Sequence, residues 1–196
     1  MWYHETESEC DIMEPIRCRW ADPASELYTV YHDQEWGVPE HNDQKLFEML
    51  ILEGFQAGLS WITILKKRDA FRKAFDGFDP AVVAGYGPEK REALMNDPGI
   101  VRNRRKIEAA VTNASAFLEI QKEFGSFDRY LWAFTDGQVI LNTDNEVRAS
   151  SDLSDRISAD LKRRGMKFVG SVIIYSFLQA VGVVNDHETG CWRYPH

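Results

Sequence analysis

Apolar positions recur along most of this chain with the period of an α-helix. In residues 42–52, for example, Leu46 and Leu50 lie one turn apart, each followed by another apolar residue, and form a stripe along one face. Asn42 or Asp43 precedes the stripe and is suited to cap its first turn. Comparable patterns predict helices over residues 61–75, 88–96, 104–120, 127–134 and 152–164.

The segments between these patterns are polar. Residues 135–150 form a polar connection, with one short extended piece expected at residues 138–141. The sequence contains no internal repeat and no run of alternating strands, and its 196 residues are enough to bury a sizeable core. The pattern therefore predicts a mostly helical fold.

One apolar stretch, residues 168–184, contains no charged side chain and is 17 residues long, the lower limit for a membrane-spanning helix. It includes Tyr175, Gln179 and two serines, and it stands alone, so a helix buried in the protein core is the favoured interpretation. The chain has three cysteines, and its acidic start lacks an apolar signal segment. These features predict a protein of the reducing cytoplasm, with no membrane contact.

The net charge of the chain is acidic, but its basic residues are concentrated in a few places. The formal net charge of −8 argues mildly against a polyanionic partner, because phosphate contacts need Lys and Arg. The basic residues are, however, clustered at residues 66–68, 102–106 and 162–164. A local patch acts within a Debye length of about 10 Å, so these clusters are either solvated helix ends or phosphate contacts.

The middle cluster belongs to a segment with a specific pattern, LMNDPGIVRNRRKIEAAV (94–111). Gly99 permits a tight turn between two helices, and the backbone amides of residues 100–102 would point outward near a helix N-terminus, where phosphate binds readily. The basic residues that follow at once are Arg102, Arg104, Arg105 and Lys106. This is the pattern of a helix-hairpin-helix, which holds DNA by its phosphates; a plain structural turn is the alternative.

Four possible metal ligands lie near the two ends of the chain. Cys18 and His32 are near its start, and His187 and Cys191, separated by three residues, are near its end. Two cysteines and two histidines make a closed tetrahedral zinc set, whose role is structural because no coordination position stays open. Because the two pairs are far apart in sequence, four unrelated residues are the alternative.

The stretch EGFQAGLSW (53–61) places Glu53 directly after an apolar helical run and Trp61 across a predicted turn. Burying an isolated carboxylate is costly. The residue is therefore either paired in an ion pair or at a helix end, or it has a functional role.

Taken together, several segments closely resemble the bacterial 3-methyladenine DNA glycosylase I family. They are CRWADPASELYTVYHDQEWG (18–37), LFEMLILEGFQAGLSW (46–61), the hairpin, and LKRRGMKFVGSVIIYSFLQAVGVVNDHETGCW (161–192). The resemblance runs from Cys18 to about Cys191. It leaves out residues 1–17, which are expected to be a flexible extension, and part of the connection at 135–155.

The resemblance implies an all-α fold of the helix-hairpin-helix glycosylase superfamily, in one domain (18–196) with two lobes and a pocket between them. It implies that Cys18, His32, His187 and Cys191 bind a structural zinc that joins the N- and C-terminal segments. Glu53 corresponds to the family's catalytic, base-recognising carboxylate, and Trp61 to its stacking aromatic. The other aromatics at or around the pocket are Tyr31, Tyr28, Trp20 and Trp36. Gly58 and Leu59 correspond to the turn that enters the gap left by the extruded base.

The activity implied by the resemblance is hydrolysis of the N-glycosidic bond of 3-methyladenine in double-stranded DNA, leaving an abasic site and the free base. No lyase step is expected, because the matching pocket motif contains no lysine. The protein is expected to be a monomer in the bacterial cytoplasm. A non-catalytic, zinc-stapled DNA-binding protein is the alternative function. A hydrolase with catalytic zinc is disfavoured by four protein ligands.

One position departs from the family pattern. Phe55 stands where a polar residue, commonly glutamine, is usual in the family. Because it lies two residues from Glu53, it is close enough to affect an edge of the pocket, and it removes none of the assigned roles; the sequence leaves its effect on the pocket open.

Overall fold

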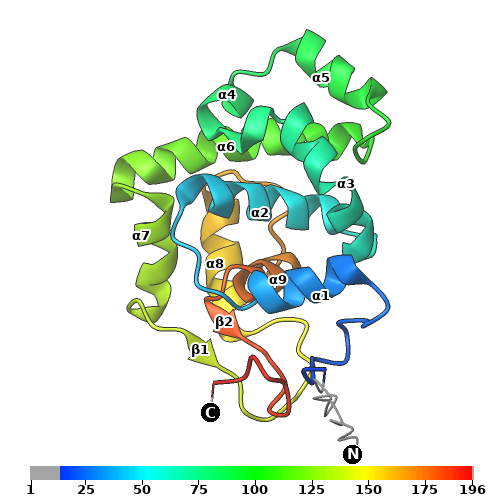
Figure 1. Ribbon diagram of the computed structural model, residues 1–196. Helices are drawn as coiled ribbons and strands as arrows, with labels where there is room; N and C mark the ends of the chain where they lie inside the picture. Colours follow the sequence, from blue (N-terminus) through cyan, green and yellow to red (C-terminus); the bar gives the residue numbers. More distant parts are fainter. Residues whose placement is uncertain (1–13, 196) are drawn as a thin grey trace, which may run out of the picture.

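The computed structural model describes residues 14–195 and is predominantly helical (Figure 1). Most of the predicted N-terminal extension, with Cys10, lies outside the described residues. The α-helices are α1 (Glu26–Gln34), α2 (Asp43–Gln56), α3 (Trp61–Ala74), α4 (Pro80–Ala84), α5 (Pro88–Asn96), α6 (Arg104–Phe124), α7 (Phe127–Trp132), α8 (Asp152–Arg163) and α9 (Ser171–Ala180). Two 3₁₀ turns, η1 (Asp76–Phe78) and η2 (Ala133–Thr135), and two short strands, β1 (Ile140–Leu141) and β2 (Val184–Asn185), accompany the helices.

The helices predicted from the periodicity are confirmed, and the short extended piece is confirmed as β1. Two further helices, α1 and α4, and the strand β2 were not predicted. The apolar stretch 168–184 forms α9 only over its central residues and then continues into β2, which pairs in parallel with β1. Within residues 14–195, no helix combines the length and the apolar character that crossing a lipid bilayer demands.

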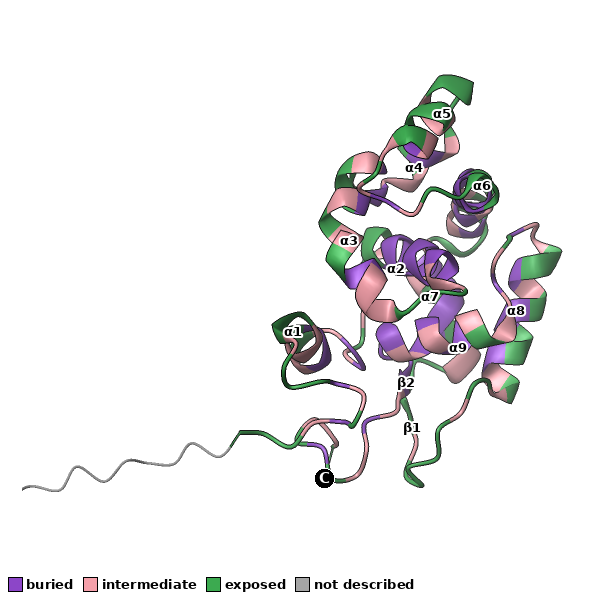
Figure 2. Cartoon of the chain, turned by 90° about the vertical axis from the view of Figure 1, so that its right-hand side faces the viewer, coloured by how far each residue is buried: buried purple, intermediate pink, exposed green. Residues whose placement is uncertain are grey.

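The core is built around α2. Every residue from Leu46 to Phe55 is buried, because α3, α6, α7 and α9 all contact this helix. Figure 2 shows α2 coloured as buried along most of its length, whereas α5 is largely exposed. A helix enclosed on all sides carries its polar residues into the interior, so Glu48 and Glu53 are both buried.

Two residues at the start of α2 stabilise the first turns of two helices, α2 and α7. The Asn42 side chain caps α2 by accepting a hydrogen bond from the Lys45 amide, which confirms one of the two predicted caps. Asp43 instead accepts hydrogen bonds from the backbone amides of Phe127 and Asp128. An acidic side chain is stabilising there, because α7 begins at that point and its first amides have no partner within the helix.

The first described residues and the C-terminal segment lie at the same end of the molecule (Figure 1). The Trp192 amide donates a hydrogen bond to the Ile16 carbonyl at 2.8 Å. Arg17 forms a two-pronged hydrogen bond with Asp33 of α1. Residues 14–17, which belong to the predicted extension, are therefore bonded to the body of the protein.

Candidate functional site

A pocket of about 280 Å³ opens between the segment before α1, the helix α1, and the ends of α2, α3 and α9. Its lining residues are Trp20, Tyr28, Tyr31, Trp36, Glu53, Gln56, Trp61, Ser176 and Gln179. The pocket thus contains all six residues that the sequence analysis places in the base-binding site. Gln56, Ser176 and Gln179 were missed; the only signal for them was the presence of Gln179 in an otherwise apolar stretch.

Glu53 supplies the only carboxyl group in this lining, which contains no lysine, arginine or histidine. The residue is 4% exposed, and its carboxylate makes no hydrogen bond or ion pair with any residue in the range 14–195. Burial raises the pKa of Glu53 to about 8, because an ion loses hydration in the interior without gaining a partner. A carboxyl group held in this way is typical of functional sites.

The other buried acid of α2 shows the contrast. Glu48 accepts hydrogen bonds from Arg68 at 2.6 Å and from Arg72 at 3.0 Å. Arg68 also reaches Glu35 at the end of α1, so this carboxylate belongs to an ion-pair network that ties α1, α2 and α3 together. Glu48 therefore has the structural ion-pair role that the sequence left open as an alternative for Glu53. Glu53 has no such ion pair.

Aromatic rings form the rest of the pocket wall. Tyr31 and Trp61 face each other with centroids 5.5 Å apart at an angle of 50°, and Trp20 meets Trp36 edge-on at 4.9 Å. The indole N–H groups of Trp20 and Trp61 are buried and have no hydrogen-bond acceptor among the described residues. The free Glu53 carboxylate, enclosed by aromatic rings, is suited to a flat heterocycle that stacks on these rings and donates a hydrogen bond.

Tyr28 has a second task besides lining the pocket. Its hydroxyl accepts a hydrogen bond from the Ile62 amide at 3.1 Å. Ser60, the N-cap of α3, makes no side-chain capping bond, so the Tyr28 hydroxyl takes that place. Because Trp61 is the first residue of α3, Tyr28 also fixes where the Trp61 ring stands.

Phe55 does not line the pocket, which answers the question that the sequence left open. Its side chain is 1% exposed and packs against Phe71 and Phe75, with ring centroids 4.9 and 5.7 Å away. Two positions along a helix correspond to a rotation of about 200°. Phe55 therefore points into the core, whereas Glu53 points into the pocket.

The four predicted metal ligands meet in one buried cluster. The potential ligand atoms of Cys18, His32, His187 and Cys191 all lie within 4.8 Å of one another. The Cys18 Sγ to His187 Nδ1 distance is 3.4 Å, Cys191 Sγ to His32 Nε2 is 3.4 Å, and Cys191 Sγ to His187 Nδ1 is 3.6 Å. A tetrahedral zinc with Zn–S of about 2.3 Å and Zn–N of about 2.0 Å places S and N about 3.5 Å apart. The cluster fits that ion.

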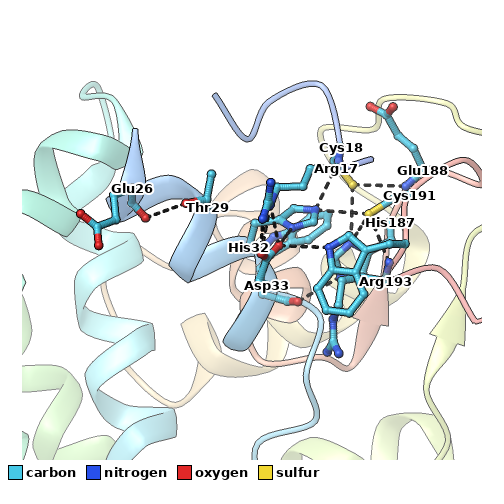
Figure 3. A network of polar contacts seen from close by, with 12 residues as sticks. Arg17, Cys18, Glu26, Thr29, His32, Asp33, His187, Glu188, Cys191 and Arg193 are labelled. Carbon is cyan, nitrogen blue, oxygen red and sulfur yellow. Dashed lines mark hydrogen bonds and ion pairs between the residues drawn. The ribbon is translucent and has the colours of Figure 1, made fainter. Parts of the chain in front are cut away.

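The surroundings of the cluster orient each ligand atom toward its centre (Figure 3). The Nδ1 atom of His32 lies 2.7 Å from the Asp33 carboxylate, and Nε2 of His187 lies 3.1 Å from the Trp36 carbonyl. Each acceptor holds the ring proton on the outer nitrogen, so the inner nitrogen presents its lone pair. Backbone amides of Glu188 and Arg193 donate to the sulfur atoms of Cys18 and Cys191.

Burial sets the protonation of these groups when no cation is bound. It lowers the pKa of His32 and lowers the pKa of His187 to about 4, and it raises the pKa of Cys18 to about 12. Both imidazoles are therefore neutral, as metal ligation requires. The sequence identified the four ligands but missed their outer partner Asp33, which carries no spacing signal beyond its place next to His32.

The cluster lies directly behind the pocket. Tyr31 precedes His32 in α1, and Trp20 follows Cys18 by two residues. Trp36 contacts the His187 ring edge-on at a centroid distance of 4.6 Å. Three walls of the pocket are thus attached to the residues that surround the candidate metal position.

The predicted hairpin consists of α5, the loop 97–103 and α6. Asn103 caps α6 by accepting from the Lys106 amide. The amides of Val101 and Arg102 have no hydrogen-bond partner among residues 14–195, whereas Ile100 is buried and its amide contacts the Asp97 carbonyl. The free amides are thus Val101 and Arg102, one residue fewer than the sequence analysis expected.

The basic residues of the hairpin fall into two groups. Arg102 and Arg105 are exposed and form no ion pair within the described residues, whereas Arg104 is paired with Glu92 at 2.8 Å. Lys106 is 8% exposed and donates to the carbonyls of Phe55 and Ala57. Lys106, which was expected to contact DNA, instead directs its ammonium to the C-terminal end of α2.

The turn 57–60, between α2 and α3, has the geometry of a fixed protrusion. Gly58 has a φ of +81°, a conformation that favours glycine. The Gln56 side chain donates to the Leu59 carbonyl at 2.9 Å, and the Leu59 amide donates to the Gln56 carbonyl at 2.7 Å. These bonds hold the turn while Leu59 stays 39% exposed beside the pocket.

Comparisons with known proteins agree with each other. A family model described as methyladenine glycosylase matches residues 20–194. The chain is 50% identical over 184 residues to DNA-3-methyladenine glycosylase 1 of Escherichia coli K12, which covers 91% of this chain and 97% of that protein. A crystal structure of 3-methyladenine DNA glycosylase I superposes with a TM-score of 0.88 at 48% identity and covers 92% of this chain and 100% of that one. The Staphylococcus aureus enzyme, studied for its recognition of 3-methyladenine, superposes with a TM-score of 0.84 at 38% identity and covers 88% and 93%.

Proposed function

The chain belongs to the 3-methyladenine DNA glycosylase I family, and from this membership and its pocket we infer that it removes 3-methyladenine from DNA by hydrolysing the N-glycosidic bond. The observation that carries the inference is Glu53, a buried carboxylate without a partner, enclosed by aromatic rings. Adenine methylated at N3 within DNA is a cation. A free carboxylate between ring faces distinguishes it from neutral adenine by charge, by hydrogen bonding and by cation–π attraction.

The reaction needs little acid catalysis. Water adds to C1′ of the sugar and loses one proton to the solvent, the bond from C1′ to the base nitrogen breaks, and its electron pair neutralises the positive charge of the departing base. The base is therefore a good leaving group. What the protein must supply is extraction of the base from the duplex and discrimination against normal bases. Glu53 holds the cation, and the faces of Tyr31 and Trp61 replace the stacking that the base loses.

We propose that the enzyme is monofunctional. A lyase step requires an amine that forms a Schiff base with C1′. The pocket lining contains no lysine, and the buried Lys106 is held by two backbone carbonyls. The products are then the free base and an intact strand with an abasic site.

The direct test is incubation of the purified chain with a methylated DNA duplex, followed by chromatography of the released bases. We expect free 3-methyladenine in solution, and strand breaks only after alkali treatment. Glu53→Gln, purified in the same way, should release the base more slowly, which would assign the release to this chain and not to a contaminant. If the unaltered chain binds the duplex but releases no base, the non-catalytic DNA-binding function is correct instead.

The DNA contacts follow from the same family membership. We propose that the free amides at Val101 and Arg102, with the side chains of Arg102 and Arg105, hold phosphates of one strand, and that the turn with Gly58 and Leu59 enters the gap left by the base. Basic side chains next to a helix N-terminus support the first part. The exposure of Leu59 beside the pocket supports the second.

Arg102→Ala and Arg105→Ala are expected to weaken binding to every duplex alike. Each change should lower the slope of log affinity against log salt by about 1 for each phosphate that the variant no longer neutralises. Arg104→Ala is the matched comparison, and a smaller effect is expected because its guanidinium is already paired with Glu92. Duplex binding measured by fluorescence anisotropy at several salt concentrations tests whether these arginines contact phosphates. A weakening that depends on the presence of the lesion would contradict a phosphate role.

We further propose that the cysteine–histidine cluster holds one structural zinc ion. The four ligands close its coordination, so it supplies no open position for substrate. Its part is to fix the segments at Cys18, His32 and 187–191 in one place. The expected setting is a monomer acting on genomic double-stranded DNA in the bacterial cytoplasm.

A further inference from the structure

The two loops assigned to DNA are joined by a reciprocal pair of lysines. Lys67, on the helix that follows the turn 57–60, donates to the carbonyls of Pro98 and Gly99 in the hairpin loop, at 3.0 and 3.2 Å. Lys106, on the helix that follows the hairpin loop, donates to the carbonyls of Phe55 and Ala57, which lead into the turn, at 2.8 and 2.7 Å. Each loop is therefore bonded to the helix that begins at the other loop.

Neither lysine forms an ion pair in the described part of the chain, and the further contact of Lys106 is with the face of the Phe168 ring, 6.0 Å from its centroid. No carboxylate in residues 14–195 pairs with either ammonium, and Lys106 is nearly fully buried. A buried cation without an anion is costly unless fixed dipoles replace its hydration. The last carbonyls of α2 provide such dipoles for Lys106, because they form the negative end of that helix.

Direct packing adds to the lysine bonds. A Cβ atom on Gly99 would lie 3.0 Å from Cβ of Ala70, which stands on α3 one turn after Lys67. The hairpin loop thus rests on α3 itself, and Ile100 is buried beneath it at 3% exposure. The spacing between the loop and the turn is determined from both sides.

We propose that Lys67 and Lys106 are positioning residues that hold the hairpin loop and the turn 57–60 together as one rigid unit. When the hairpin binds phosphates, this unit places Leu59 in the base stack at the nucleotide that is being extruded. This inference rests on the proposed function. Extruding a base costs unstacking and unpairing, which an inserted side chain offsets only when it stands at the correct distance from the held backbone. A turn that moved independently of the hairpin would lose that advantage.

The test is the double variant Lys67→Met/Lys106→Met, which keeps the aliphatic stems and removes the four hydrogen bonds. Three quantities are measured: single-turnover excision from a duplex at saturating enzyme, affinity for undamaged duplex, and affinity for free 3-methyladenine. We expect excision to slow by roughly ten- to a hundredfold, as small misplacements near a reaction do. Free-base affinity should be retained, because the pocket lining contains neither lysine.

Lys66→Met is the matched control for charge. Lys66 neighbours Lys67 on α3, is exposed, and makes no hydrogen bond or ion pair among the described residues. It should lower duplex affinity as much as Lys67→Met does, and leave the excision rate at saturation unchanged. Lys67→Arg, which retains donors for both carbonyls, should restore most of the rate that Lys67→Met removes.

Three outcomes would overturn the proposal: an unchanged excision rate in the double variant, an equal slowing in Lys66→Met, or a parallel fall in the free-base affinity of the folded double variant, which would show that the lysines act on the pocket itself. If Lys106→Met does not fold, Lys67→Met alone decides the question by the same three measurements. Failure of the proposed function is distinguishable, because the unaltered chain would then release no base at all.

Discussion

Glu53→Gln is expected to bind free 3-methyladenine ten- to a hundredfold more weakly than the unaltered chain. The substitution keeps the shape of the side chain but removes its charge and presents N–H donors to a ligand that needs an acceptor. A hydrogen bond to a charged group contributes about 1.5–3 kcal/mol, which corresponds to that range of affinity. The measurement is a calorimetric titration at pH 9, where the carboxyl group, with a pKa of about 8, is ionised.

The same carboxyl group predicts a pH dependence of excision. Because burial raises the pKa of Glu53 to about 8, the ionised form that attracts the cationic base becomes populated between pH 6 and 9. kcat/KM, which reports ionisation in the free enzyme, should rise over that interval and then level off. Tyr31 does not interfere, because burial and the nearby Glu53 raise its pKa well above 10. In Glu53→Gln the profile should be flat.

The same ionisation affects stability in the opposite direction: excision rises with pH, whereas stability falls. The folded state holds the Glu53 proton more tightly than the unfolded state does, so the free energy of unfolding should fall as pH rises from about 4.5 to 8. Glu53→Gln should remove that fall.

Two controls separate base recognition from a structural role. Affinity for a duplex with an abasic site should change little in Glu53→Gln, because no base occupies the pocket there. Trp61→Ala should weaken free-base binding as well, through loss of a stacking face. If Glu53→Gln bound the free base as tightly as the unaltered chain, this carboxylate would be structural.

Loss of the metal is expected to have the largest effect on stability. Elemental analysis should find about one zinc per chain, and Cys191→Ser should lower the melting temperature by about 10 °C or more. A ligand present at a thousand times its Kd stabilises the folded state by about 4 kcal/mol. In a chain of this size, each kcal/mol corresponds to about 2–4 °C.

Cys10→Ser is the matched control for Cys191→Ser, because the sequence analysis leaves that cysteine outside the ligand set. It should melt like the unaltered chain and keep its zinc. A purified protein that lacks metal and melts at the same temperature before and after Cys191→Ser would disprove the zinc site.

Periodicity predicted the long helices well because apolar residues recur along them at helical spacing, including α2, which is buried on all sides. It missed α1, whose sequence ELYTVYHDQ mixes β-branched and aromatic residues with polar ones, and α4, which is only five residues long. Both are positioned by tertiary contacts. For α1 the contact is the Arg68 network, whose partners lie 20 and 33 positions away in the sequence.

The sequence predicted which residues gather at the candidate site better than it predicted the orientation of their side chains. All six pocket residues and the four possible ligands came together as expected. What the sequence did not settle is where single side chains point: Phe55 into the core, Lys106 toward α2, and Gln56, Ser176 and Gln179 into the pocket. The orientation of one side chain depends on neighbours that are distant in sequence, and no local pattern records them.

The positions of the four cluster residues in the sequence also limit when the cluster behind the pocket can be completed during synthesis. Cys18 and His187 are 169 positions apart, so the ribosome has translated almost every helix before the second pair of ligands exists. Trp20, Tyr31 and Trp36 are among the first of the described residues to emerge, yet the cluster behind them is incomplete until residues 187–191 leave the exit tunnel. A nascent chain can therefore form much of its helical body, but it completes the cluster behind the base pocket only after residues 187–191 have emerged.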